Sequence, residues 1–141
     1  MIVEKISSGT VIDHIPAGMG MRVLGLLGIG TDYGSRVALV MNVPSKRMGK
    51  KDIVKIEGTT VQPSLANTIA LIAPKATINI ISKESVTGKY SAEPPEKFIG
   101  GKCPNPNCIT YVESGNEEFA RTKEGYMCVY CERIFKSIEI I

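Results

Sequence analysis

Four cysteines near the C-terminus are the residues of this chain whose type and spacing most directly predict chemistry. Cys103 and Cys108 are separated by four residues, Cys128 and Cys131 by two, and nineteen residues lie between the pairs. A short turn between two cysteines supplies two adjacent corners of a tetrahedral metal site, and two such turns make a closed site. Because the sole histidine, His14, lies far upstream, the spacing predicts one structural Zn²⁺ held by four thiolates.

Two disulfides, or four unrelated buried thiols, are the alternatives. Disulfides belong to oxidising compartments, and the N-terminal Met-Ile-Val-Glu-Lys lacks the pattern of a secretory signal. Unrelated thiols would not fall into two pairs with Pro-Asn-Pro-Asn inside the first. Since residues 100–141 are too few to bury a stable core unaided, we expect zinc to supply most of the folding free energy of this module.

Charge and hydropathy narrow the class of protein. The net charge is +3, but residues 1–99 carry twelve Lys and Arg against eight Asp and Glu, whereas residues 100–141 carry five against six. A zinc module that binds nucleic acid should be basic, so we expect no nucleic-acid partner. The apolar runs are far shorter than the about 20 residues of a membrane span. With reduced cysteines and no targeting signal, these features predict a cytoplasmic protein.

Hydrophobic periodicity predicts the elements that position these residues. We expect strands at 2–6, 10–15, 36–43, 52–57, 76–82 and 85–90, and helices at about 16–27 and 63–72. From Thr10 onward this order is that of the ferredoxin-like α+β fold, an antiparallel sheet with two helices on one face. We therefore expect this domain over 1–92, a linker over 93–101, and a small all-β zinc-binding domain over 102–141.

The first hundred residues offer little that could catalyse a reaction. The glycines between 18 and 30 do not form the Gly-x-Gly-x-x-Gly pattern of a dinucleotide loop. One histidine and no spare cysteine make a nucleophile with its base hard to assemble. Asp13 and His14 are adjacent on a predicted strand, so their side chains should point to opposite faces. We expect no catalytic residues.

A basic cluster is more informative. Its members are Lys46, Arg47, Lys50, Lys51 and Lys55, with Asp52 as the one acid among them. A solvated turn is one interpretation. However, Lys51 and Lys55 open and continue a predicted strand, and Lys89 lies on another strand of the same sheet, so the group suits a triphosphate. RNA is less favoured because the cluster contains no aromatic residue for stacking.

Five motifs appear in an order that resembles one known family. They are Gly9-Thr-Val-Ile-Asp-His-Ile-Pro-Ala17, Met48-Gly-Lys-Lys-Asp-Ile-Val-Lys-Ile-Glu57, Ala73-Pro-Lys-Ala-Thr-Ile-Asn79, Cys103-Pro-Asn-Pro-Asn-Cys-Ile109 and Cys128-x-x-Cys-Glu132. Together they resemble the regulatory chains of aspartate carbamoyltransferase, and the resemblance covers nearly the whole chain.

The resemblance implies a non-catalytic regulatory subunit. It implies a nucleotide-binding ferredoxin-like domain, a regulatory homodimer, and a zinc domain that docks on the catalytic chain. It also implies feedback control of pyrimidine synthesis, in which CTP inhibits, often helped by UTP, and ATP opposes from the same site.

The resemblance also implies roles for individual residues. The phosphates should meet Lys51, Lys55, Lys89 and His14. The base and ribose should be surrounded by Asp13, Lys55, Asn79, Ile6, Ile81 and Val86. The positions near the catalytic-chain interface should be Asn105, Asn107, Tyr130 and Glu132.

Two other function classes remain as alternatives. A zinc-ribbon RNA-binding adaptor is the first, and the acidic C-terminal module argues against it. A small standalone enzyme of ferredoxin-like fold is the second, and the shortage of catalytic groups argues against that.

Overall fold

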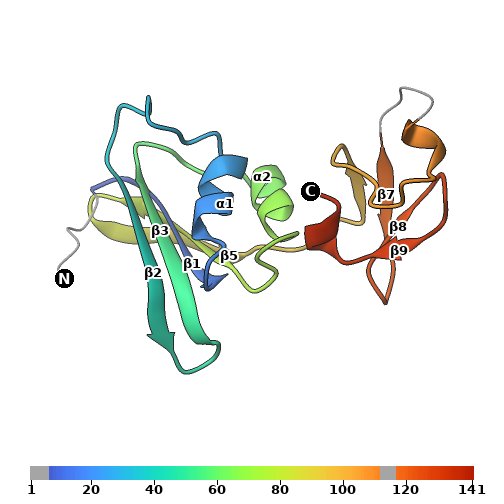
Figure 1. Cartoon of the computed structure of the whole chain (residues 1–141). Coiled ribbons are helices and arrows are strands. Elements are labelled where there is room, and N and C mark those ends of the chain that lie inside the picture. The colour runs from blue at the N-terminus through green and yellow to red at the C-terminus, as the bar shows by residue number, and fades with distance from the viewer. Residues whose placement is uncertain (1–6, 112–116) are drawn as a thin grey trace. The chain divides into compact units, whose positions relative to one another are not determined.

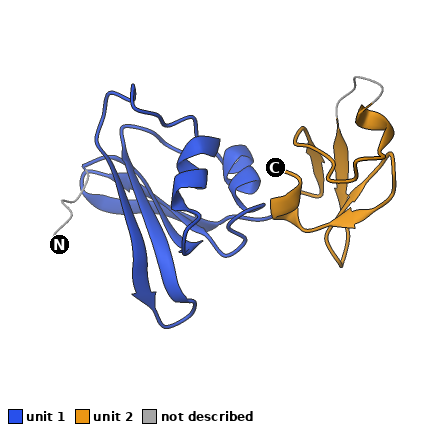
Figure 2. Ribbon diagram, in the orientation of Figure 1, with its two compact units in different colours: residues 1–94 blue, residues 95–141 orange. Residues whose placement is uncertain are grey.

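The computed structural model describes residues 7–111 and 117–141. The chain divides into two compact units, Met1–Pro94 and Pro95–Ile141, shown in blue and orange in Figure 2. Each unit contains its own sheet. The predicted strand at 2–6 lies outside the described residues.

Unit 1 is built on a five-stranded antiparallel sheet. Its elements are β1 (Gly9–Pro16), α1 (Gly20–Leu26), β2 (Val37–Ser45), β3 (Gly49–Glu57), α2 (Pro63–Ile69), β4 (Thr77–Ser82) and β5 (Ser85–Ser91). The order across the sheet is β2-β3-β1-β4-β5, which places β1 in the middle. Figure 1 shows both helices on the same side of the sheet. The predicted ferredoxin-like α+β fold is confirmed, with β5 added as an edge strand.

The hydrophobic core lies between this sheet and the two helices. Ile12 of β1 pairs with Val54 of β3 and with Ile78 of β4, and all three side chains are fully buried. Directly paired residues in an antiparallel sheet point to the same face, so these three face the helices, which bury Val23 and Ile69 against them. The alternate residues of the same strands therefore lie on the opposite face.

The helices are shorter than the sequence predicts. α1 begins at Gly20 rather than near Pro16, because Pro16 still belongs to β1 and a turn follows it. α2 ends at Ile69, after which turns lead into β4. Among the described residues, no helix is long and apolar enough to span a membrane.

A buried carboxylate, Asp52 of β3, fixes the start of α1. Its Oδ2 accepts the backbone N–H groups of Gly18 and Gly20 at 3.0 and 2.9 Å. Its Oδ1 accepts the N–H of Asn42 at 3.0 Å, at a bulge in β2 where Asn42 has a positive φ of 60°. Asp52 is 0% exposed, so these three donors replace the water that a buried carboxylate loses.

Unit 2 is a four-stranded antiparallel sheet with two short 3₁₀ turns. Its elements are β6 (Lys97–Ile99), η1 (Ile109–Tyr111), β7 (Glu118–Arg121), β8 (Tyr126–Cys128), β9 (Ile134–Phe135) and η2 (Ser137–Glu139). Among the described residues of this unit, few besides the cysteines are buried, chiefly Phe119, Tyr126 and Ile140. The linker predicted over 93–101 overlaps β6, which pairs with β7 and therefore belongs to this sheet.

Replacing Asp52 with asparagine should destabilise unit 1. An amide presents an NH₂ group where the carboxylate now accepts a backbone N–H, so a buried donor would face a donor. We expect Asp52→Asn to lower the free energy of unfolding by about 1–3 kcal/mol, measured by urea denaturation followed by circular dichroism.

The matched control is Glu57→Gln on the same strand. Glu57 pairs with Arg36 at 2.6 Å, and the Arg36 side chain is 57% exposed, so this ion pair should contribute only about 0–1 kcal/mol. An Asp52→Asn variant no less stable than Glu57→Gln would contradict the role given to Asp52.

Candidate functional sites

A row of four residues crosses the face of the unit 1 sheet that is turned away from the helices. Val11 of β1 pairs with Lys55 of β3 and with Asn79 of β4, and Asn79 pairs with Lys89 of β5. Because paired residues share a face, the side chains of all four lie on one face. We call this the polar face. It brings together three of the residues predicted to bind a nucleotide.

An aliphatic pair lies beside this row. Ile81 follows Asn79 by two positions on β4, so it lies on the same face, and it pairs with Val86 of β5. Val86 is 59% exposed, and Ile81 is half-buried. The polar face therefore offers apolar surface next to the Asn79 amide. Ile6, the third aliphatic residue predicted here, lies outside the described residues.

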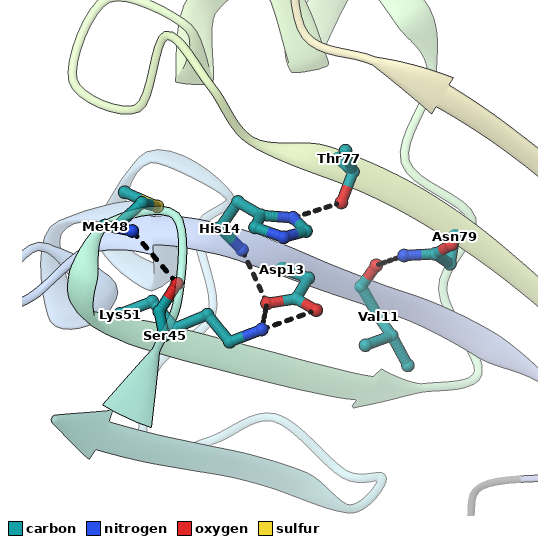
Figure 3. A network of polar contacts seen from close by, with 8 residues as sticks. All are labelled: Val11, Asp13, His14, Ser45, Met48, Lys51, Thr77 and Asn79. Carbon is teal, nitrogen blue, oxygen red and sulfur yellow. Dashed lines mark hydrogen bonds and ion pairs between the residues drawn. The ribbon is translucent and has the colours of Figure 1, made fainter. Parts of the chain in front are cut away.

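A β-bulge in β1 overturns the expectation that Asp13 and His14 face opposite sides. The pairing with β3 shifts between Ile12 and Ile15, and His14 has a positive φ of 59°. Asp13 pairs with Thr77 of β4, and His14 Nδ1 lies 3.1 Å from Thr77 Oγ1. Since bulges re-aim side chains, both residues reach the polar face, as Figure 3 shows.

Asp13 and Lys51 form an ion pair on this face. Lys51 Nζ lies 2.9 Å from Asp13 Oδ1, and Asp13 Oδ1 also accepts the His14 backbone N–H at 2.6 Å (Figure 3). Burial alone would raise the pKa of Asp13, but the hydrogen bonds from Lys51 and His14 hold that pKa below its usual value. Asp13 is therefore a carboxylate at neutral pH that fixes the position of the Lys51 ammonium.

The remaining two lysines differ from Lys51. In unit 1, the ion pairs among residues 7–94 involve Lys51 and Arg36, but neither Lys55 nor Lys89. Three strand spacings, about 14 Å, separate the backbones of Lys55 and Lys89. The amide of Asn79, which lies between them, donates to the Val11 carbonyl at 3.3 Å. Cations at both ends of the row, with the Asn79 amide and the aliphatic Val11 between them, suit an extended anion that also carries a less polar part.

The second site is the cysteine cluster of unit 2. The four sulfur atoms all lie within 4.8 Å of one another, and the cysteines are not joined as disulfides. The Sγ atoms of Cys103 and Cys131 are 3.7 Å apart, and those of Cys108 and Cys128 are 3.8 Å apart. Tetrahedral coordination with Zn–S bonds of about 2.3 Å places sulfurs roughly 3.8 Å apart. The donor set therefore fits one tetrahedral metal ion.

Backbone donors surround this cluster. Five backbone N–H groups near the sulfurs act to lower the pKa values of the four cysteines, and they belong to Asn105, Thr110, Tyr130, Cys131 and Arg133. Burial raises the pKa of Cys103 and that of Cys128, whereas the Thr110 hydroxyl lowers the pKa of Cys108. A metal ion must displace the protons of the thiols with raised pKa values, which couples metal binding to pH.

The four residues predicted near a partner interface differ in exposure. Asn107, Tyr130 and Glu132 are exposed. Asn105, in contrast, is only 7% exposed, and its Oδ1 accepts the Asn107 N–H at 3.0 Å within the first cysteine turn. The side chain of Asn105 thus shapes the turn and offers little surface to a partner.

Sequence reasoning missed two residues beside these sites, Thr77 and Thr110. Thr77 contacts His14, and only the strand register places it opposite Asp13. The Thr110 hydroxyl donates to Cys108 Sγ at 3.2 Å. Its position two residues after a cysteine of a metal-binding turn was the signal that could have identified it.

Comparison with known proteins assigns both units. The family model described as "Aspartate carbamoyltransferase regulatory chain, allosteric domain" matches residues 1–93, and that of the metal binding domain matches residues 99–141. These matches fall in unit 1 and unit 2, respectively.

Relatives that carry the same name are similar over nearly their whole length. The aspartate carbamoyltransferase regulatory chain of Pyrobaculum arsenaticum is 50% identical over 139 residues, which cover 94% of this chain and 92% of the relative. That of Thermofilum pendens is 46% identical, with 100% and 92% covered, and that of Pyrococcus furiosus is 46% identical, with 99% and 95% covered. These findings give no support to an RNA-binding adaptor. The matched domains contain the sheet face with Lys55 and Lys89 and the cluster of four thiols, and the chain belongs to the family of aspartate carbamoyltransferase regulatory chains.

Proposed function

We propose that this regulatory, non-catalytic chain binds CTP and ATP, with UTP as a further effector, on the polar face of unit 1. Through this binding it controls the catalytic chain of aspartate carbamoyltransferase in pyrimidine synthesis. The observation that carries the proposal is the row Lys55–Val11–Asn79–Lys89, which lies in the domain that matches the allosteric-domain model.

The chemistry of the face divides a nucleotide between two regions. We assign the phosphates to the cations Lys51, Lys55 and Lys89 together with His14, because several charges of a triphosphate need several donors. We assign the base to Asn79, Ile81 and Val86, where an amide beside aliphatic side chains can combine hydrogen bonding with apolar contact. We assign the ribose to Asp13 and to Lys55, which also contacts the phosphates.

Control of a catalytic chain requires more than tight binding. An effector shifts an equilibrium only by as much as its affinity differs between two states of the assembly. CTP and ATP share a triphosphate and differ in the base. If the two nucleotides have opposite effects from one site, the difference must therefore originate where the base binds, beside Asn79, Ile81 and Val86.

We propose that the metal of unit 2 is Zn²⁺ and that the folded metal-binding domain docks on the catalytic chain. Four thiolates favour zinc over harder divalent ions, and a tetrahedral site filled by protein ligands has no open position for a catalytic water. The exposed residues Asn107, Tyr130 and Glu132, in or near the two cysteine turns, lie where a docking surface would depend on the metal. We further propose that two chains pair through unit 1.

Lys89→Ala should weaken the binding of both nucleotides. A hydrogen bond to a charged group contributes about 1.5–3 kcal/mol, which corresponds to roughly ten- to hundredfold in affinity. CTP and ATP should lose affinity alike, because a phosphate contact does not distinguish the bases. Calorimetry on the zinc-loaded chain measures both affinities.

Lys75→Ala is the matched control, because Lys75 is exposed in the turn before β4 and outside the row. It should leave both affinities within about twofold, as expected for loss of an exposed charge that solvent and salt screen. If Lys89→Ala left both affinities unchanged, the lysines of the polar face would be solvated surface residues that do not bind the phosphates.

Asn79→Ala should change the ratio of the two affinities. Its amide lies beside Ile81 and Val86, and a neutral hydrogen bond contributes about 0.5–1.5 kcal/mol, or roughly two- to tenfold. CTP and ATP present different donors and acceptors there, so one should lose more than the other. Equal losses of affinity for CTP and ATP in the same calorimetric titration would show that the base does not bind beside Asn79.

Removing zinc should separate the regulatory and catalytic chains without abolishing nucleotide binding. Structural zinc contributes roughly 10–16 kcal/mol of apparent binding free energy in small domains, and unit 2 has few other buried residues. Chelation, or Cys131→Ser, should release the catalytic chain on a sizing column. Calorimetry should still detect the binding of CTP to the metal-free chain, because unit 1 has its own core.

Readdition of Zn²⁺ is the control for chelation and should restore the complex of the wild-type chain. A metal-free chain that still elutes as a full-size complex would contradict the dependence of docking on the metal.

A further inference from the structure

Thr110 makes an unusual contact with the cysteine cluster. Its Oγ1 donates a hydrogen bond to Cys108 Sγ at 3.2 Å. Cys108 is 1% exposed, so water does not provide this sulfur with an alternative donor. The Thr110 hydroxyl is thus a side-chain donor to a buried thiol.

The local structure holds Thr110 in place. Thr110 is the middle residue of η1, which begins directly after Cys108, and the Tyr111 N–H donates to the Cys108 carbonyl at 3.1 Å. The Tyr111 hydroxyl donates to the Cys103 carbonyl, and Lys102 Nζ lies 5.2 Å from the centre of the Tyr111 ring. Tyr111 therefore ties η1 to the first cysteine of the turn, and the Thr110 hydroxyl is directed inward.

Electrostatics explains why such a donor matters. Four thiolates around one divalent ion carry a net negative charge, and Cys103, Cys108 and Cys128 are buried. Burying charge is costly unless hydrogen bonds replace the lost water. Hydrogen bonds to the ligand atoms also fix their orientation, and their loss typically costs 10–100-fold in metal affinity.

We propose that Thr110 is a positioning residue of the metal centre, which orients Cys108 Sγ and stabilises its thiolate through the side-chain hydroxyl. The inference rests on the proposed function in one respect, that the cysteine cluster holds Zn²⁺. It adds a residue outside the four ligands on which the affinity and the electronic character of the site depend.

The test compares three variants of the full-length chain. Thr110→Val keeps the shape of the side chain and removes the hydroxyl, whereas Thr110→Ser keeps the hydroxyl. Thr122→Val is the matched control, because the Thr122 hydroxyl in the same unit donates to the Gly125 carbonyl at 2.8 Å, a contact with backbone rather than sulfur. Competition with a chromophoric chelator gives the affinity of each chain for Zn²⁺.

We expect Thr110→Val to bind Zn²⁺ about 10–100-fold more weakly than the wild-type chain, and Thr110→Ser to bind it with nearly wild-type affinity. The affinity of Thr122→Val for Zn²⁺ should remain within about threefold of the wild-type affinity, because the Thr122 hydroxyl shares no partner with the cysteine sulfurs. Equal affinities of wild type and Thr110→Val would overturn the inference. So would equal losses in Thr110→Val and Thr122→Val, because the effect would then come from general instability of unit 2.

A second readout does not depend on folding stability. In the Co²⁺-loaded chain, the sulfur-to-metal charge-transfer band should move to lower energy in Thr110→Val, because a thiolate without its hydrogen bond gives up an electron more easily. It should stay unchanged in Thr110→Ser and Thr122→Val. An unshifted band in Thr110→Val would overturn the inference, whereas a wild-type chain that binds neither Zn²⁺ nor Co²⁺ would overturn the proposed metal site itself.

Discussion

The pairing of β1 with strands on both of its sides is the constraint on which the polar face depends. β1 is the first strand of the described chain, yet it lies in the middle of the sheet, between β3 and β4. Its register therefore determines which residue of β3 faces which residue of β4, and through β4 the position of Lys89 on β5. A shift of the β1–β4 pairing register by one residue would turn Asn79 toward the helices and Ile78 toward the solvent. The buried core on one face thus fixes the positions of the polar side chains on the other.

Two neighbouring residues of β3 connect the two faces. Lys51 lies on the polar face in an ion pair with Asp13, and Asp52 lies on the helix face, where it holds the start of α1 and the bulge of β2. A ligand that displaces the Lys51 side chain would therefore act on β3 next to Asp52, the residue that supports the start of α1 and the bulge of β2. In unit 2 the corresponding constraint is the cluster of four thiols, since few other residues are buried there.

Parts of the arrangement of these residues could be predicted from the sequence, for physical reasons. The spacing of the cysteines was enough to predict that the four sulfurs lie together, because ligands on two short turns leave the chain few other arrangements. The predicted strand at 52–57 contains Lys55, and strand alternation accounts for Lys55 lying on the face opposite the buried Val54 and Ile56. The β1 bulge was not predictable from alternation, since nothing in Asp13-His14 marks a positive φ at a histidine, and the start of α1 depends on a carboxylate more than thirty residues away. Asn79 and Lys89 became binding candidates through family resemblance and the basic residues, and the register then placed them side by side.

The central claim is that a nucleotide bound to this chain controls a separate catalytic chain. The most direct measurement is the aspartate saturation curve of the catalytic chain, recorded alone and after reconstitution with the zinc-loaded regulatory chain, each with and without CTP. We expect CTP to shift the curve of the reconstituted complex and to leave the curve of the catalytic chain alone unchanged. A complex that forms and binds CTP but shows the same curve with and without it would contradict control by the bound nucleotide.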